Sequence, residues 1–569
     1  MPTVQSSLRL AFAWVAAMCT LTACAGPTRP ADGNAPRGPS QAQRALVLIT
    51  RQEAPSVSGT SLVPGAFTTN SQRRPFNAWL TYADANDTAI PYLAEALPQL
   101  DSESWKVFPD GRMETIYRLK PDLTWHDGIP LTAEDFAFAW KVYSSPDLAI
   151  ASTRPMNVME EVAAPDPRTV VIAWKQPYYE AGMLNTNWTP LPRHLLEEAL
   201  PQGTEFLLNR PYWTTRFVGL GPYRLDRWEP GAFIDGSSFE GHVWGKPKID
   251  RIRINFIGDA EAVLANLLAG EGHLPVDNSI RVQQALTLSE RWELTKGGTI
   301  VYQPTLWRWS HVQHRPEHAN PPDVRDLRVR RALMHAINKP ELNETILDGK
   351  GIMADSFIAP GVSYFPEVDR AIAKYPFDVR RAGQIMQEAG YRKGPDGYFT
   401  GPGGKPVFEY RVNTSAQNDA ERSVVANGWR KAGFAFEEAN FSPIETTQRE
   451  FSSSFRSLWA TSGGGGEAWI NNILSSVIPG PDNGWRGSNR GGWANPEYDR
   501  LVTAFNNSLV RSERDQAIIQ VAKIVTEELP VLPLFFNPAP WAWPSSVQGV
   551  RINAPNTEPT WNIHEWEFK

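Results

Sequence analysis

The sequence predicts a large mixed α/β protein built from two or three domains. Its 569 residues exceed what one hydrophobic core usually supports. Segments with the periodicity of a strand alternate with segments of helical periodicity along the chain, and no repeat of fixed length recurs. With 41% hydrophobic and 21% charged residues, the composition is that of a globular protein. This alternation is typical of the α/β class.

The first elements follow from apolar runs and from alternation. The run ALVLI at residues 45–49 predicts a buried strand with which the folded part begins. METIYRLK at residues 113–120 alternates like a half-buried strand. Thr132 and Asp135 have the spacing of a capping box that opens a helix. One face of that helix is aromatic and apolar: Phe136, Ala139, Trp140 and Tyr143.

The middle of the chain repeats the mixture. Residues 221–228 and 250–257 predict strands, and residues 259–270 predict a helix that ends at Gly270. Residues 325–340 predict a helix with its arginines mainly on the solvated side. Its apolar face comprises Val329, Ala332, Leu333, Ala336 and Ile337.

Cap residues mark the later helices. Asp378 begins a helix that ends with Gly390 at C′, and Asn495-Pro496 opens another. A last long helix is predicted from about Ser512 to Glu528, followed by a buried strand at residues 531–536.

The first residues predict export. A lone Arg9 precedes the apolar run LAFAWVAAMCTLTA, which ends at Cys24. A bilayer span needs about 20 apolar residues, so this run suits the core of a signal peptide instead. LTACA resembles a bacterial lipobox, in which Cys24 receives a diacylglyceryl group; the alternative is an ordinary signal peptide with a chance cysteine. We expect a signal peptide at residues 1–23, a flexible Pro- and Gly-rich tether at residues 24–44, and a lipid-anchored protein of the bacterial cell envelope.

Several function classes find no support. The net charge of −6 and the lack of a basic block argue against a nucleic-acid partner. GPDGYFTGPGGKP at residues 394–406 lacks the glycine and the Ser/Thr of a phosphate loop, and no G-x-S-x-G elbow occurs. The histidines show no metal-ligand spacing, with His311 and His314 the nearest approach, so no metal or cofactor is expected. Carboxylates are too numerous to identify a glycosidase pair, so an enzyme is not excluded.

The segment FRSLWATSGGGGEAWINN, residues 455–472, contains four consecutive glycines between tryptophans. Ordering such a run has a high conformational entropy cost. It could be a linker, a phosphate cradle or one wall of a binding site. The lysine and the helix-opening Ser/Thr of a phosphate loop are missing.

Motifs spread over nearly the whole mature chain point to one family. They are PYLAE (91–95), TWHDGIPLTAEDFAFAW (124–140), APDPRTVVIAW (164–174), VGLGPYRLDRWEPG (218–231), KPKIDRIRINFIGD (246–259), DLRVRRALMHAIN (326–338), YPFDVRRAGQIMQEAGY (375–391), NPEYDRLV (495–502) and ELPVLPLFF (528–536). In this order they resemble the family 5 extracellular solute-binding proteins, the oligopeptide, dipeptide and nickel receptors of ABC importers. The sequence departs from the family pattern at Leu220, His273 and Asn338, where Thr, an acidic residue and Asp are usual.

The resemblance implies an α/β, periplasmic-binding-protein-like clamp of two lobes with an extra inserted domain. Lobe I would comprise residues 45–81, 206–300 and 541–569. The inserted domain II would comprise residues 82–205, and lobe III residues 301–540. Closure of the lobes would bury the ligand, and ligand binding would favour the closed state.

The function that the resemblance implies is that of a monomeric, non-enzymatic solute-binding lipoprotein. It would capture an oligopeptide or peptide-like solute and deliver it to an ABC permease complex. One alternative is an exported Trp-rich carbohydrate-binding protein or glycan-active enzyme, given the 22 tryptophans. A metal or metallophore receptor is a third possibility, which the lack of clustered His, Cys or Met weakens.

The resemblance also implies a site in lobe III. Trp459 matches a tryptophan that lines a side-chain pocket, and Ser462 stands where peptide-binding members have an Asp that pairs with the peptide's α-ammonium. Gly463 and Gly464 would leave room for ligand or expose backbone N–H groups. A hydrogen bond to a charged group contributes about 1.5–3 kcal/mol, so either Glu467 replaces the Asp or the ligand lacks a free amino terminus. Further candidates on the segments that match the cleft are Trp307, Trp309, Trp469, Trp485, Arg486 and Phe536.

Overall fold

The computed structural model describes residues 44–58, 62, 70–84, 88–442, 445, 448–552 and 560–569. Arg44–Lys569 forms one compact unit. The predicted signal peptide, Cys24 and nearly all of the tether lie outside the described residues.

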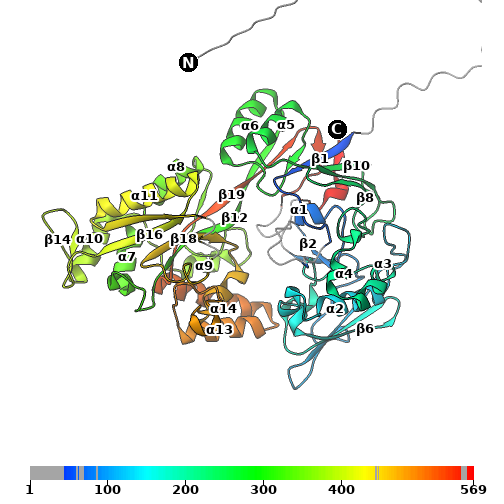
Figure 1. Cartoon of the computed structure of the whole chain (residues 1–569), viewed down its shortest axis with the longest axis horizontal. Helices are drawn as coiled ribbons and strands as arrows, with labels where there is room; N and C mark the ends of the chain where they lie inside the picture. The colour runs from blue at the N-terminus through cyan, green and yellow to red at the C-terminus, as the bar shows by residue number, and fades with distance from the viewer. Residues whose placement is uncertain are drawn as a thin grey trace, which may run out of the picture. The chain divides into compact units, whose positions relative to one another are not determined.

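A five-stranded sheet joins the start of the folded chain to a later segment (Figure 1). In spatial order its strands are β11 (Leu274–Pro275), β1 (Ala45–Thr50), β10 (Arg251–Phe256), β9 (Phe233–Ser238) and β8 (Tyr223–Glu229). β1 is parallel to both of its neighbours, β10 and β11. The chain therefore leaves this sheet after β1 and returns to it at β8.

The helices near this sheet are α1 (Asn70–Arg73), α5 (Ala260–Ala269) and α6 (Val282–Thr295). The Asp259 carboxylate accepts a hydrogen bond from the Ala262 N–H at 2.8 Å and caps α5, which ends at Gly270 with a φ of 76°. Both ends lie where the sequence predicts them.

The segment between β1 and β8 contains its own four-stranded antiparallel sheet. In spatial order its strands are β4 (Trp105–Val107), β5 (Met113–Arg118), β7 (Thr169–Trp174) and β6 (Met159–Asp166). The other elements of this segment are the β2–β3 pair (Thr81–Ala83 and Ala89–Pro91), α2 (Ala133–Tyr143), α3 (Arg193–Leu196) and α4 (Thr204–Leu208). The Asp135 carboxylate accepts from the Thr132 N–H at 2.9 Å, which confirms the predicted capping box at the start of α2.

A six-stranded mixed sheet forms the remaining part of the unit. In spatial order its strands are β13 (Ile352–Met353), β19 (Val531–Pro544), β12 (Gly298–Val312), β18 (Leu458–Gly463), β16 (Val407–Asn413) and β17 (Ala435–Phe441). β16 runs parallel to β17 and β18, and the other pairs are antiparallel.

The elements that accompany this sheet are α7 (Leu327–His335), α8 (Lys339–Leu347), α9 (Phe365–Ala371), α10 (Val379–Glu388), α11 (Ala416–Ala432), α13 (Pro496–Asn507), α14 (Arg511–Glu528) and the β14–β15 pair (Arg392–Lys393 and Phe399–Thr400). The short strands β20 (Val547–Gln548) and β21 (Glu567–Phe568) pair near the C-terminus. The caps at Asp378, Gly390 and Asn495 confirm the predicted helix boundaries.

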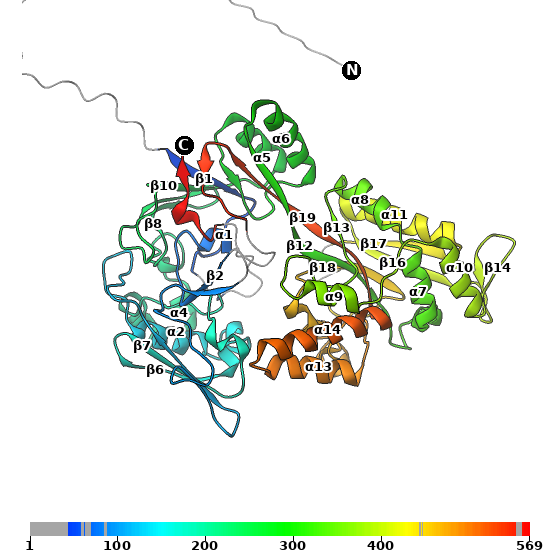
Figure 2. The same cartoon turned by 180° about the vertical axis from the view of Figure 1, so that it is seen from behind.

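β12 and β19 are the longest strands of the described chain and run side by side (Figure 2). Their antiparallel ladder extends from the Gly298–Pro544 pair to the His311–Val531 pair. The predicted boundaries of lobe III, 300/301 and 540/541, fall at the same level of this ladder, because Val301 pairs with Trp541. The strand predicted at residues 531–536 continues to Pro544, since β12 supplies a partner along its length.

Candidate functional site

β18 and β12 set which candidate residues share a face of the sheet. Trp307 pairs with Gly463, Trp309 with Thr461, and His311 with Trp459. Because side chains alternate along a strand, these residues face one side, and Ser462 faces the other with its partner Arg308. Trp459 and Ser462, three residues apart, therefore lie on opposite faces of β18, and the Ser462 side chain is exposed.

Four of the predicted residues form a buried aromatic cluster: Trp307, Trp309, Trp469 and Phe536. The rings of Trp307 and Trp309 stack with centroids 4.6 Å apart, and Trp469 meets Trp307 edge-on at 4.7 Å. The three indoles are 0%, 6% and 1% exposed, and their N–H groups find no partner among the described residues. The structure thus places these tryptophans in the core below the candidate site.

The glycine run is explained in part by this cluster. A Cβ on Gly463 would lie 3.0 Å from the Trp309 ring, and one on Gly465 would lie 2.7 Å from the carbonyl oxygen of Phe357. Gly466 has a φ of 74°, and its N–H donates to the same oxygen at 2.8 Å. Only Gly464 of the first three faces open space. Close packing within the chain therefore accounts for most of the run.

Trp459 is 2% exposed and lies among the rings of Phe441, Phe455 and His311. The guanidinium carbon of Arg490 lies over the indole at 4.6 Å from its centroid, a cation–π geometry. Burial, followed by the charge of Arg490, lowers the pKa of His311 to about 3, so its imidazole is neutral at pH 7. Arg490 is thus the only charged group among these contacts.

Arg490 also lines a pocket of about 400 Å³. The lining residues are Arg449, Ser452, Ser453, Trp485, Arg486, Gly487 and Arg490. This places the predicted residues Trp485 and Arg486 together, and Arg490 connects them to Trp459. The pocket contains three arginines and no carboxylate.

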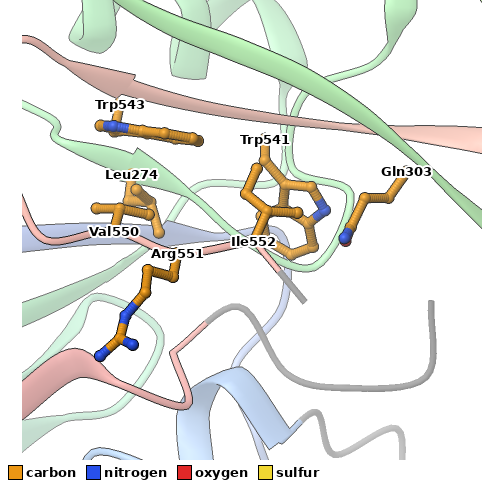
Figure 3. A pocket seen from close by; sticks show the side chains of 7 residues that line it. All are labelled: Leu274, Gln303, Trp541, Trp543, Val550, Arg551 and Ile552. Carbon is orange, nitrogen blue, oxygen red and sulfur yellow. The ribbon is translucent and has the colours of Figure 1, made fainter. Parts of the chain in front are cut away.

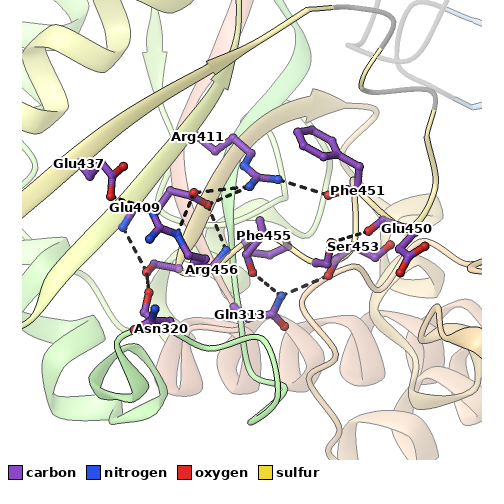
Figure 4. A network of polar contacts seen from close by, with 12 residues as sticks. Gln313, Asn320, Glu409, Arg411, Glu437, Glu450, Phe451, Ser453, Phe455 and Arg456 are labelled. Carbon is purple, nitrogen blue, oxygen red and sulfur yellow. Dashed lines mark hydrogen bonds and ion pairs between the residues drawn. The ribbon is translucent and has the colours of Figure 1, made fainter.

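A buried polar network holds the walls of this pocket. Arg315 donates to the carbonyl oxygens of Pro479 and Arg490, both at 2.9 Å, and also to that of Ser453. Gln313 donates to the carbonyl oxygen of Phe455 at 2.7 Å (Figure 4). The two chain segments that line the pocket are therefore fixed to the end of β12.

Ion pairs continue the network on its other side. Glu409 binds Arg456 at 3.1 Å and Arg411 at 3.2 Å, and Arg411 donates to the carbonyl oxygen of Phe451 at 3.2 Å (Figure 4). These contacts hold the segment that precedes β18 on both sides of the pocket-lining serines.

Glu467 lies apart from this pocket, at the start of the 3₁₀ helix Glu467–Ile473. Its carboxylate binds Arg511 at 2.9 Å and is 22% exposed. Nearby, the ring of Tyr179 contacts Phe505 at 5.7 Å and lies 4.4 Å below Arg514. Glu467 is thus already paired with Arg511, the first residue of α14.

A second recess lies between the long strands and the C-terminal segment (Figure 3). Its lining is Leu274, Gln303, Trp541, Trp543, Val550, Arg551 and Ile552. Its free space of about 10 Å³ is about that of one water molecule. It is too small to hold a solute.

Other kinds of site find no counterpart in the described part of the chain. There, no cluster of three or more His, Cys, Asp or Glu is placed to hold a metal ion. None of the helices in the described residues has the length and apolarity to cross a bilayer.

Sequence reasoning missed Arg449 and Arg490. For Arg490 the signal was the run WRGSNRGGW at residues 485–493, which combines tryptophan, arginine and glycine. A Cβ on Gly491 would lie 2.2 Å from the carbonyl oxygen of Val312, and one on Gly492 would lie 2.4 Å from Arg315. These glycines let the chain approach β12 closely and so position Arg490.

Two sheets joined by long paired strands, an inserted domain and a preformed pocket define the class of a solute-binding protein. Residues 95–480, more than half of the chain, match the family model described as bacterial extracellular solute-binding proteins, family 5 Middle. The chain belongs to this family.

The chain is also similar to curated proteins and to a solved structure. A putative ABC transporter peptide-binding protein of Brucella abortus (strain 2308) is 25% identical over 296 residues, which are 51% of this chain and 52% of that protein. The match thus spans about half the length of that relative. The oligopeptide-binding protein AppA of Bacillus subtilis (strain 168) is 22% identical over 564 residues, 96% of each chain.

The oligopeptide-binding protein of Thermus thermophilus, solved in complex with a pentapeptide, superposes with a TM-score of 0.68. It is 22% identical, and the match covers 92% of this chain and 96% of that one. This similarity confirms the predicted fold class, the two-lobed α/β clamp of periplasmic binding proteins. The relatives are binding proteins of ABC transporters, not enzymes, so the alternative of a glycan-active enzyme is not favoured.

Proposed function

We propose that the chain is the lipid-anchored receptor of an ABC importer, which captures an oligopeptide or peptide-like solute between its lobes and delivers it to the permease. Membership of the family over residues 95–480 carries this proposal. The names of the relatives, a putative peptide-binding and an oligopeptide-binding protein, favour a peptide-like ligand. The receptor works as a monomer.

In this proposal the lobes have the boundaries expected from the sequence. Lobe I contains the sheet of β1 and β8–β11, domain II the β4–β7 sheet, and lobe III the six-stranded sheet. The β12–β19 ladder is the connection about which the lobes close, with its register shift between Pro304 and Trp307 as the point of bending.

The ligand contacts Trp485 and Arg486, and the buried Trp459 supports this wall through Arg490. The cluster of Trp307, Trp309, Trp469 and Phe536 lies in the core. No carboxylate stands at position 462, and Arg511 already neutralises Glu467 at 2.9 Å. A desolvated ammonium without a counter-charge is unfavourable. The bound solute therefore does not place a free α-ammonium at this point.

Peptide capture tests the proposal. The full chain is titrated calorimetrically with alanine tri- to pentapeptides that carry either a free or an acetylated amino terminus, and native mass spectrometry identifies what co-purifies. We expect the acetylated peptides to bind at least as tightly as the free ones. Binding of free peptides alone would overturn the blocked-terminus inference, and a lack of any peptide-like ligand, or turnover of a glycan, would overturn the proposed function.

Position 462 provides a matched pair of variants. Ser462 lies on the face of β18 opposite Trp459, so Ser462→Asp tests whether the amino terminus of the ligand reaches that face. If it does, the variant should raise the affinity for free peptides relative to acetylated ones by about 10-fold, the effect of one charge-assisted hydrogen bond. Ser462→Asn, which adds similar volume without charge, should not. Equal effects of both variants would show that this position does not face the amino terminus.

Fractionation tests the anchor. Wild-type chain should be found with membranes, and Cys24→Ser should release it into the soluble fraction. Unchanged membrane association of the variant would contradict lipidation at Cys24.

A further inference from the structure

We propose that the pocket of Arg449, Arg486 and Arg490 is an anion subsite that holds a carboxylate of the captured solute against Trp485. The solute is then an acidic peptide-like molecule. This inference rests on the proposed function, because it concerns the ligand that the receptor captures.

The positive charge around this pocket is unbalanced. In the described chain none of these three guanidinium groups forms an ion pair or a hydrogen bond, whereas nearby arginines do: Arg456 binds Glu409 at 3.1 Å and Arg511 binds Glu467 at 2.9 Å. The acidic residues that adjoin the pocket in sequence, Glu450 and Asp482, are exposed and do not line it. In the described part of the chain, three positive charges thus surround one cavity without a counter-ion, in a protein with a net charge of −6. The Arg449 and Arg486 side chains are exposed, and that of Arg490 is half-buried.

Arg490 is placed between this pocket and Trp459. It is half-buried, and its guanidinium carbon lies over the Trp459 ring at 4.6 Å from the centroid. Its N–H groups have no acceptor among the described residues, and a guanidinium can bind a carboxylate in a bidentate manner. A carboxylate bound there would replace the water contacts of this cation by charge-assisted hydrogen bonds.

Contacts within the chain fix this pocket in place. Arg315 ties the backbone of Arg490 to that of Pro479, with both distances 2.9 Å. An added Cβ on Gly491 would clash with the carbonyl oxygen of Val312 in β12, and one on Gly492 would clash with the Arg315 side chain. Arg490 is therefore held on a rigid support, as a recognition residue requires, and is not a free surface arginine.

Size and lining select the ligand group. A volume of about 400 Å³ is that of a pocket for a small ligand, with room for an acidic side chain and its neighbouring groups but not for a whole oligopeptide. Trp485 supplies an apolar wall for the methylene groups that carry an acidic side chain. Arginine binds carboxylate and phosphate alike, and a free inorganic anion is the competing source that the test must separate.

The test uses calorimetry on the full chain with four probes. Two are acetylated, amidated tetra-alanine peptides in which one residue is replaced by Glu or by Gln; the third has no replacement but a free terminal carboxylate; the fourth is inorganic phosphate. Each is measured on wild type, Arg490→Gln, Arg486→Gln and the matched control Arg380→Gln. Arg380 is an exposed arginine of α10 outside the pocket, so its variant loses the same charge elsewhere.

The Glu peptide, or the peptide with a free carboxylate, should bind about 10-fold or more tightly than the Gln peptide. Arg490→Gln and Arg486→Gln should abolish that difference, whereas Arg380→Gln should keep it. Since Arg486 is exposed, its variant should fold as wild type even if Arg490→Gln is less stable.

Other outcomes separate the two proposals. If acidic and neutral peptides bind equally to all variants, the anion subsite is wrong and the peptide receptor stands. If phosphate binds in an Arg490-dependent manner and no peptide does, the pocket binds anions but the acidic peptide-like ligand is wrong, and the proposed function fails with it. If no probe binds, both fail.

Discussion

At the residue scale, neighbouring side chains of β12 lie on opposite faces of the sheet and make different contacts. Trp307 and Trp309 face the aromatic cluster, and Arg308 between them faces α11. There the Arg308 guanidinium binds the Glu421 carboxylate at 2.6 and 3.1 Å, and Tyr410 donates to the same carboxylate at 3.1 Å. The two charged side chains are 7% and 0% exposed. This buried pair joins the sheet to its covering helix.

Glu421→Ala should lower the free energy of unfolding by about 3–5 kcal/mol, because it leaves Arg308 buried without a counter-charge. Urea unfolding followed by tryptophan fluorescence measures the loss. The double variant Arg308→Met with Glu421→Leu should recover most of it, since no charge then remains in the core. A Glu421→Ala protein as stable as wild type would show that water reaches Arg308.

Single residues also show how much of the candidate site could be predicted from the sequence. It identified the tryptophans of the candidate site, but not that Trp307, Trp309 and Trp469 lie in the core while Trp459 contacts Arg490. Residue type cannot decide this, because a Trp serves equally well in a core and in a binding wall. Arg490 was missed because the role proposed for it depends on the lack of a carboxylate partner among the described residues, which only the three-dimensional structure reveals.

At the element scale, two motifs that carried the family resemblance meet. His126 of TWHDG accepts from the Gly219 N–H at 3.1 Å through Nδ1, and its Nε2–H donates to the carbonyl oxygen of Gly221 at 3.0 Å. A Cβ on Gly221 would lie 2.3 Å from the backbone of Phe76 and Asn77. The glycines of VGLGPYRL are thus needed where three chain segments cross.

Gly221→Ala should therefore destabilise the protein strongly, by about 1–3 kcal/mol or more, since backbone atoms must move to admit the methyl group. The matched control is Gly403→Ala, where a Cβ would meet nothing within 4 Å. Thermal unfolding of both variants gives the comparison. Equal melting temperatures would mean that the crossing is looser than the structure shows.

Sequence signals predicted those features of the helices and strands that depend only on neighbouring residues. The caps at Thr132, Asp259, Asp378 and Asn495 fixed helix starts, because a cap acts within its own turn. The length of β19 was missed, since it depends on pairing with β12, a strand more than 200 residues earlier.

At the scale of the whole molecule, buried histidines from distant segments share one property. Burial is the largest cause that lowers the pKa of His126 to about 4 and those of His311, His314 and His564 to about 3. Burial also lowers the pKa of His242 well below its usual value. These imidazoles are neutral in the folded protein and gain protons on unfolding in mild acid.

This property predicts a loss of stability between pH 6.5 and about 4. In that window the unfolded chain binds protons at these histidines and the folded chain does not, so the free energy of unfolding falls as the pH falls. Each such histidine contributes about 1.4 kcal/mol per pH unit. Carboxylates whose pKa values are lowered, such as Asp378, lose their contribution only at more acidic pH.

Urea unfolding at pH 7, 6 and 5 measures the slope, which should exceed that of one histidine. His126→Gln should reduce the pH slope of the free energy of unfolding by about the contribution of one histidine. At pH 7 the variant should be destabilised only by the loss of the hydrogen bonds to Gly219 and Gly221. A stability independent of pH over this range would mean that solvent reaches these imidazoles in the folded protein. Because they lie in both the first sheet's region and the six-stranded sheet's region, a uniform slope would further show that the two regions unfold together.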